Sequence, residues 1–119
     1  MNKTKLSKTE WLKIEPKIIK EAQKNRDAFA PLYDRYYLEI FGFIQKRIGD
    51  YDIAGDITAQ VFLKAMINIP RYKDKGFPFS SWLYRISINE INSHYRKLKR
   101  TSTVELSERH FSALTDELT

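Results

Sequence analysis

The chain has 119 residues, 42% of them hydrophobic and 30% charged, which is the size and composition of one folded domain. It has no cysteine, which excludes a disulfide scaffold and a thiol nucleophile, and no apolar run of the roughly 20 residues that a membrane helix needs. Basic residues outnumber acidic ones by 21 to 15, and the net charge of +6 favours a polyanionic partner. We therefore expect a cytoplasmic protein that binds such a partner.

The apolar residues recur at the three- and four-residue spacing of helices, and only four glycines and four prolines interrupt them. This pattern predicts an all-α fold. Ser7 and Glu10 have the spacing of a capping box and predict a short first helix. Pro16 would end or kink that helix before a second piece over residues 17–24. Residues 1–16 are accordingly interpreted as an N-terminal extension.

Two amphipathic helices follow in the sequence, with signals at their ends. Asp27 is expected to cap the first, whose apolar face would extend to Ile48, and Gly49 to end it. Asp52 is expected to cap the second, which would stop at Pro70. The basic surplus of the chain lies outside both helices, so the molecule should present two surfaces of different charge.

Residues 71–78 read RYKDKGFP, a sequence typical of a loop that touches a ligand. A fourth helix is predicted to begin within residues 78–81 and to end in the basic sequence at 96–100. Residues 101–119 are polar and acidic, and we interpret them as a linker or frayed tail.

Aromatic and basic side chains alternate throughout residues 70–100. A single nucleic-acid strand binds such a surface, because unpaired bases stack on aromatic rings for roughly 1–3 kcal/mol each and cations neutralise the phosphates. The alternative is that the rings form a core stripe and the charges a solvated face. Spacing alone leaves these two interpretations balanced.

Signatures of catalysis are missing from the sequence. There is no glycine-rich phosphate loop, and His94 and His110 have no partner at a metal-ligand spacing. We expect no enzymatic activity, no metal and no cofactor.

Three sequence blocks match a known family in order and spacing: DAFAPLYDRYY at 27–37, AGDITAQVFLKA at 54–65 and FSSWLYRISINEINSHYRKLKR at 79–100. Together they resemble region 2 of the sigma-70 family of RNA polymerase sigma factors, most closely the extracytoplasmic-function (ECF) subfamily, over about residues 17–100. The resemblance implies a compact bundle of three to four helices with a basic loop before the last one. It also implies a transcription initiation factor that binds the clamp helices of the polymerase β′ subunit and melts the promoter −10 element through its non-template strand.

The resemblance assigns polymerase binding to one side of the helix expected before Pro70. The residues at the matching positions are Asp56, Ala59, Gln60 and Leu63. The sequence departs from the family pattern here, since Gly55 and Gln60 stand where glutamate is usual and Ala59 where glutamine is usual. Losing acidic groups weakens complementarity to a basic partner.

The resemblance also implies that the basic loop forms a pocket for a base flipped out of the non-template strand. Tyr72 and Phe79 would be its apolar walls, and Asn89 would hydrogen-bond a base edge. Trp82 would either support strand separation or pack in the core. The full set of expected DNA-binding residues is Lys64, Arg71, Tyr72, Lys73, Lys75, Phe79, Ser80, Ser81, Trp82, Arg85, Asn89 and Arg96.

ECF sigma factors also carry region 4, which reads the −35 element. The chain is too short to include it, so residues 101–119 are interpreted as the linker towards region 4 in a fragment. The implied partners are the RNA polymerase core, promoter DNA and an anti-sigma factor, with the free protein a monomer not inserted in a membrane. The alternative is a helical adaptor with a basic face and no specific role on DNA, and a third reading is a non-specific RNA-binding protein.

Overall fold

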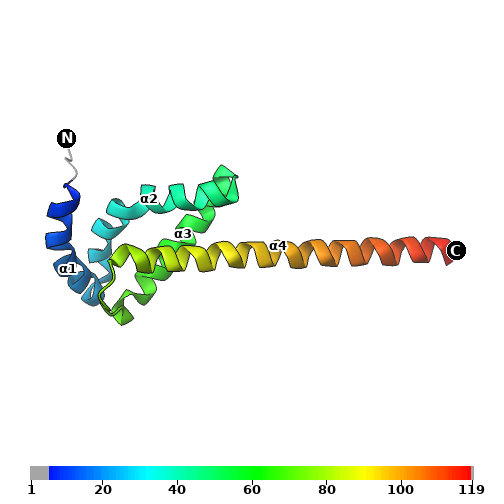
Figure 1. Ribbon diagram of the computed structural model, residues 1–119. Helices are drawn as coiled ribbons and strands as arrows, with labels where there is room; N and C mark the ends of the chain where they lie inside the picture. Colours follow the sequence, from blue (N-terminus) through cyan, green and yellow to red (C-terminus); the bar gives the residue numbers. More distant parts are fainter. Residues whose placement is uncertain (1–5, 119) are drawn as a thin grey trace.

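The computed structural model describes the backbone of residues 6–118 and the side chains of residues 6–103 (Figure 1). Within that part of the chain all regular structure is helical, which confirms the predicted all-α fold. The elements are α1 (Lys8–Lys24), the 3₁₀ turn η1 (Arg26–Phe29), α2 (Ala30–Ile48), α3 (Tyr51–Asn68), the 3₁₀ turn η2 (Ile69–Arg71) and α4 (Phe79–Leu118).

The first helix begins as predicted but is not interrupted. Ser7 Oγ accepts a hydrogen bond from the Glu10 amide at 3.1 Å, and Glu10 Oε1 accepts one from the Ser7 amide at 2.9 Å, which completes the capping box. The predicted break at Pro16 is wrong, because α1 runs through it as one helix. Trp11 before the proline and Ala22 after it are both buried, so packing of the whole helix outweighs the hydrogen bond that proline removes. Most of the predicted N-terminal extension is thus part of α1.

Two of the expected helix caps are displaced by two residues. The side chain of Asn25 accepts from the Asp27 amide at 3.0 Å, so Asn25 rather than Asp27 caps the turn that leads into α2. Asp50 rather than Asp52 caps α3, with its Oδ1 accepting from the Ile53 amide at 2.9 Å. Gly49 ends α2 as predicted, in the left-handed conformation at φ 84° that glycine adopts without strain.

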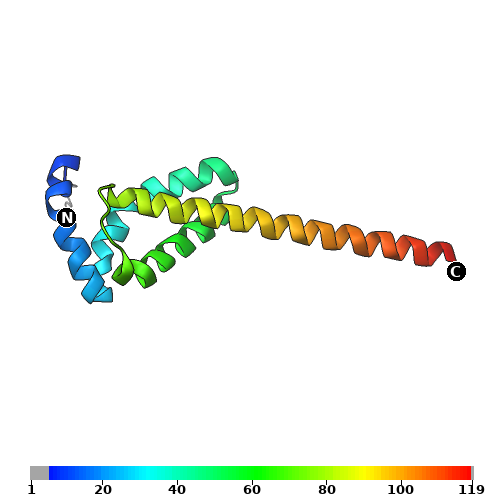
Figure 2. The same ribbon diagram turned by 60° about the horizontal axis from the view of Figure 1, so that its bottom comes forward.

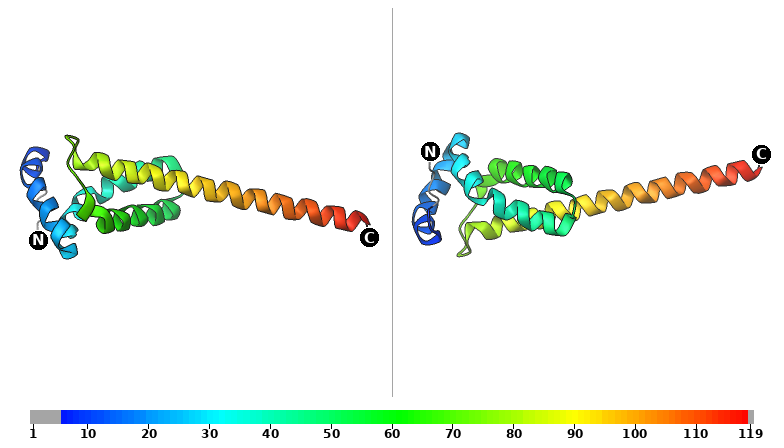
Figure 3. Two further views of the ribbon diagram at one scale, coloured as in Figure 1. Left: turned by 90° about the horizontal axis from the view of Figure 1, so that it is seen from below. Right: turned by 90° about the horizontal axis from the view of Figure 1, so that it is seen from above.

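Helices α2, α3 and the first part of α4 pack together, and α1 crosses one end of this bundle (Figures 2 and 3). The core between them includes four side chains with no exposed surface: Leu32 and Ile44 of α2, Val61 of α3 and Leu83 of α4. Each such side chain contributes about 1.5–3 kcal/mol by leaving water. Trp11 joins the core from α1, where it packs edge-on against Tyr36 with 6.1 Å between ring centroids.

Helix α4 is the longest element, with 40 residues, and its second half projects beyond the bundle (Figure 1). The molecule is therefore elongated, 72 × 31 × 25 Å. The expectation that the last helix ends at 96–100 is wrong, because the backbone stays helical through 101–118. No helix in the described part of the chain is long and apolar enough to span a membrane.

Candidate nucleic-acid interface

The basic loop between η2 and α4 is held in place by α1. Gln23 Nε2 donates hydrogen bonds to the carbonyl oxygens of Ile69, at 3.1 Å, and Tyr72, at 2.8 Å. Further along, the side chain of Asp74 accepts from the amide of Gly76 at 2.8 Å, and Gly76 has φ 88°, which favours glycine. The start of the loop is thus fixed to α1, and its tip has a defined turn.

A cavity of about 210 Å³ opens where this loop meets the start of α4. Its lining combines basic groups, aromatic rings and a hydroxyl, with no carboxylate among them. The lining residues are Arg71, Tyr72, Lys73, Lys75, Phe77, Pro78, Ser81, Trp82 and Arg85. Seven of them belong to the set expected to bind DNA, so the fold brings together what the sequence only placed in succession. Such a site suits a planar ring attached to an anionic backbone.

Three aromatic rings stabilise one wall of the cavity. Tyr72 packs against Trp82 with 5.0 Å between ring centroids and against Phe79 with 5.2 Å, while Phe79 and Trp82 are 5.4 Å apart. Phe79 is only 2% exposed and is not part of the lining, so it supports the wall from beneath instead of forming it as expected. Trp82 packs against this cluster, which is one of its two expected roles, and it also lines the cavity.

The phenol of Tyr72 stays neutral at physiological pH. Burial raises its pKa above the ordinary value of 10.0, and the negative charge of Asp74 raises it further. The hydroxyl therefore remains a hydrogen-bond donor.

The remaining expected DNA-binding residues lie outside the cavity. Asn89 and Arg96 are exposed and follow Arg85 at four- and seven-residue steps, so they continue one face of α4 away from the cavity. Ser80 is half-buried beside it. Lys64 lies on α3, where its ammonium group pairs with Glu90 of α4 at 2.5 Å, which links the two helices.

The residues expected to bind polymerase form an exposed ridge on α3. Ala59 and Leu63 border a largely apolar groove of about 380 Å³ between α2 and α3, which Tyr33 also lines. Asp56 and Gln60 border a second groove, of about 280 Å³, between α3 and α4. All four side chains are exposed, and none lines the basic cavity.

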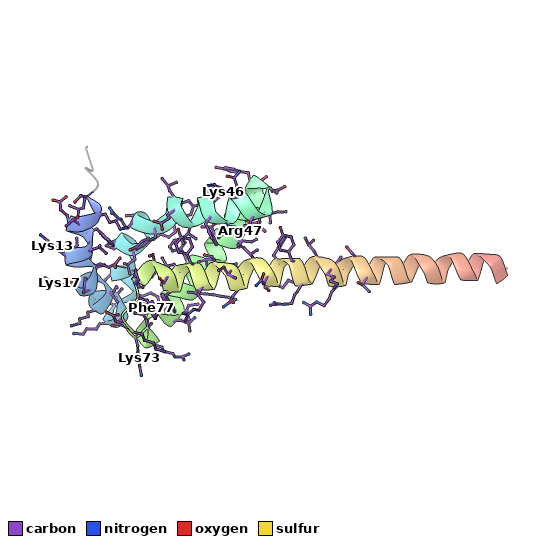
Figure 4. All side chains as sticks on the ribbon, in the orientation of Figure 1. Lys13, Lys17, Lys46, Arg47, Lys73 and Phe77 are labelled. Atoms are coloured by element: carbon purple, nitrogen blue, oxygen red, sulfur yellow. The ribbon has the colours of Figure 1, made fainter. Side chains whose placement is uncertain are left out.

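Two residues that line the cavity, Phe77 and Pro78, are not in the set of DNA-binding residues expected from the sequence. Phe77 is 67% exposed, although phenylalanine is ordinarily a core residue (Figure 4). A signal was present, because a phenylalanine between Gly76 and Pro78 cannot belong to a helical core stripe.

A family model described as Sigma-70 region 2 matches residues 32–101. The chain is 37% identical over 84 residues to the ECF RNA polymerase sigma factor SigW of Bacillus subtilis, covering 70% of this chain and 44% of that protein. It is 32% identical over 80 residues to the ECF RNA polymerase sigma factor BldN of Streptomyces coelicolor, covering 66% of this chain and 30% of that protein. The chain therefore spans less than half the length of these relatives.

Proposed function

Because this chain belongs to the sigma-70 region 2 family, in its ECF branch, we propose that it acts in transcription initiation by capturing the −10 element of a promoter. The observation that carries this proposal is the basic aromatic cavity between the loop and α4. It places Arg71, Lys73, Lys75 and Arg85 around the rings of Tyr72, Phe77 and Trp82.

Capture of the strand begins with one unpaired base of the non-template strand in this cavity. Taking a base out of the duplex costs a few kcal/mol, and stacking on an aromatic ring returns roughly 1–3 kcal/mol. Tyr72 and Trp82 supply the ring faces, and the hydroxyls of Tyr72 and Ser81 supply donors for the base edge. Arg71 and Arg85 bind the adjoining phosphates.

The strand continues along α4 beyond the cavity. Asn89 lies one turn after Arg85 on the same exposed face, where its amide can both donate to and accept from the next base edge. Arg96, two turns further, binds the backbone. Because all of these contacts are non-covalent, the protein melts DNA by binding the open strand more tightly than the duplex.

The second half of the proposal assigns the α3 ridge to the β′ clamp helices of RNA polymerase. Leu63 is 44% exposed beside the apolar groove between α2 and α3, which suits an anchor for a partner helix. The ridge and the basic cavity share no lining residue, so polymerase and DNA can bind together. An anti-sigma factor would inhibit by covering either surface.

Fluorescence anisotropy with short single-stranded DNA of varied sequence tests the DNA half. We expect wild-type protein to prefer a subset of sequences and to bind more weakly as salt rises. Tyr72→Ala and Asn89→Ala should lower affinity for the preferred strand about fivefold or more and flatten the preference. Tyr51→Ala is the matched control, because Tyr51 is 68% exposed and lies outside the cavity.

Indifference to strand sequence, with both variants binding like Tyr51→Ala, would reduce the basic region to non-specific electrostatics and favour the adaptor function instead. The polymerase half is tested separately by pull-down of the polymerase core. Leu63→Glu should weaken capture at least tenfold, whereas Ile88→Glu, at a 46% exposed position of α4, should not. Equal capture of both variants would contradict the assignment of the ridge.

A further inference from the structure

A third groove, of about 340 Å³, lies on the other side of the basic loop, between the loop and α1. Its α1 wall includes Pro16, Ile19 and Lys20, and its loop wall includes Asp74. Tyr72, Phe77 and Pro78 line both this groove and the basic cavity. The highly exposed ring of Phe77 therefore separates this groove from the basic cavity.

Helix α1 carries a row of four lysines, of which Lys20 lines this groove. Lys13, Lys17, Lys20 and Lys24 follow one another at steps of four, three and four residues, which places them along one face of the helix. All four are exposed, and none forms an ion pair within the described part of the chain. Lys13 and Lys17 project outward at the same end of the molecule as Lys73 and Phe77 (Figure 4).

Two acidic residues, Glu15 and Asp74, line the groove beside Lys20, so the positive charge comes from the whole lysine row of α1 and not from the groove lining. Glu15 is 5% exposed and already accepts hydrogen bonds from the Trp11 indole, at 2.5 Å, and the Tyr36 hydroxyl. Asp74 is exposed, but one of its oxygens accepts from the Gly76 amide. The lysine row thus leaves α1 electropositive beside an aromatic edge, which is the combination that a single strand requires.

We propose that the groove is a second nucleotide subsite for single-stranded DNA, next to the basic cavity. The strand passes over the ring of Phe77, with one base in the cavity and the neighbouring base stacked on the groove side of the ring. The phosphates of the strand then lie on Lys17 and Lys20. This inference rests on the proposed function, because it extends the strand that the cavity is proposed to hold. It gives α1 a role in binding DNA that is independent of packing.

Anisotropy of the full chain with two sets of DNA strands tests the subsite. The short set spans only the preferred sequence of the cavity, and the long set adds two nucleotides at the 5′ or the 3′ end. We expect one direction of extension to tighten binding roughly fivefold or more, the lower end of base stacking on an aromatic ring. The doubly substituted variant Lys17→Gln, Lys20→Gln should lose that gain and still bind the short strand as wild type does.

Salt dependence separates this site from general attraction. Removing two phosphate contacts should flatten the slope of log affinity against log salt by about 1.4 for the long strand. Lys46→Gln is the control for loss of a distant positive charge, because Lys46 lies at the far end of α2 (Figure 4); it should change the slope for neither strand. Phe77→Ala should weaken both strands, since its ring lines both recesses.

The possible failures can be told apart. If the short strand binds with sequence preference but neither extension tightens binding, or if the double variant behaves like Lys46→Gln, the second subsite is overturned and the cavity stands. If the short strand itself binds without preference, the proposed function fails, and the second subsite fails with it.

Discussion

The hydroxyl of Tyr84 makes stability sensitive to alkaline pH. It donates to Glu39 Oε2 at 2.6 Å, while its ring packs edge-on against Phe43 with 4.8 Å between centroids. Burial and the hydrogen bond to Glu39 raise the pKa of Tyr84 to about 12. Tyrosine in the unfolded chain has a pKa of about 10, so above that pH the unfolded state loses its proton first and stability falls.

We therefore expect the urea midpoint to be constant with respect to this group below about pH 10 and to fall as pH rises towards about 12. Tyr84→Phe should be less stable than wild type at pH 8 by about 1 kcal/mol, because it loses one hydrogen bond. It should also lose less stability between pH 9 and 11. Equal losses in both proteins would assign the alkaline transition elsewhere, for example to Tyr36, whose pKa burial also raises.

Glu15 connects α1 to the core through two buried donors. Its Oε2 accepts from Trp11 Nε1 and from the hydroxyl of Tyr36. Glu15→Ala removes the acceptor of the Tyr36 hydroxyl and one of the two acceptors of Trp11 Nε1, which also donates to the Tyr36 hydroxyl at 3.1 Å. We expect urea unfolding to show a loss of roughly 1–3 kcal/mol. Glu21→Ala, at an exposed position of the same helix, should change stability by no more than about 0.5 kcal/mol. A loss at Glu15 no larger than at Glu21 would show that the cluster does not hold α1.

At the scale of single residues, the sequence predicted which kinds of side chain make up the site but not where each aromatic ring lies. Alternation of rings and cations left a nucleic-acid surface and a core stripe equally open, and the cavity contains both rings and cations. Which ring is buried depends on the path of the loop, which Gln23 fixes from a helix about 50 residues earlier in the sequence. Phe79 was therefore expected at the wall but lies beneath it, and Phe77 was missed.

A glycine inside α3 and a glycine at the end of α2 respond oppositely to the same substitution. Gly55 lies inside α3, and a Cβ added there would meet nothing within 4 Å. Gly55→Ala should raise stability by about 0.5–1 kcal/mol, because alanine loses less backbone freedom in a helix. Gly49, with φ 84°, has equal space, yet Gly49→Ala should cost about 1–2 kcal/mol since the left-handed conformation disfavours a side chain.

Urea denaturation of the two alanine variants beside wild type measures both signs in one experiment. A loss of stability in Gly55→Ala would mean that the residue has a packing role that its open surroundings do not indicate. A polymerase pull-down with the Gly55→Ala variant also tests whether a methyl group added beside Asp56 changes the proposed contact.

The elements themselves were more predictable than their ends. Three- and four-residue spacing located α2 and α3, because an amphipathic helix must turn one face to the core. The ends depend on single local choices, so Asp50 replaced Asp52 as the cap of α3. Pro16 is a stronger signal, but the burial of Trp11 and Ala22 on either side of it outweighs the local preference for a break.

The length of α4 decides the shape of the whole molecule. The polar, acidic composition of residues 101–119 suggested a frayed tail, because it offers few apolar positions for docking. The backbone of 101–118 instead continues the helix that the core fixes between Phe79 and Ile91. A preformed helix needs no new nucleus, so each further residue adds one hydrogen bond at little cost.

This geometry predicts that the far half of α4 contributes to shape and not to the stability of the bundle. Among the side chains of residues 6–103, the last buried one is Ile91, and the ribbon of the projecting half has no other element beside it (Figure 3). A chain ending after Thr103 should therefore unfold with the wild-type free energy within about 0.5 kcal/mol. Its radius of gyration in small-angle X-ray scattering should fall below the 20.2 Å of the full chain, towards the roughly 13 Å of a globular domain. A marked loss of stability with an unchanged radius would mean instead that the far half of α4 folds back onto the bundle in solution.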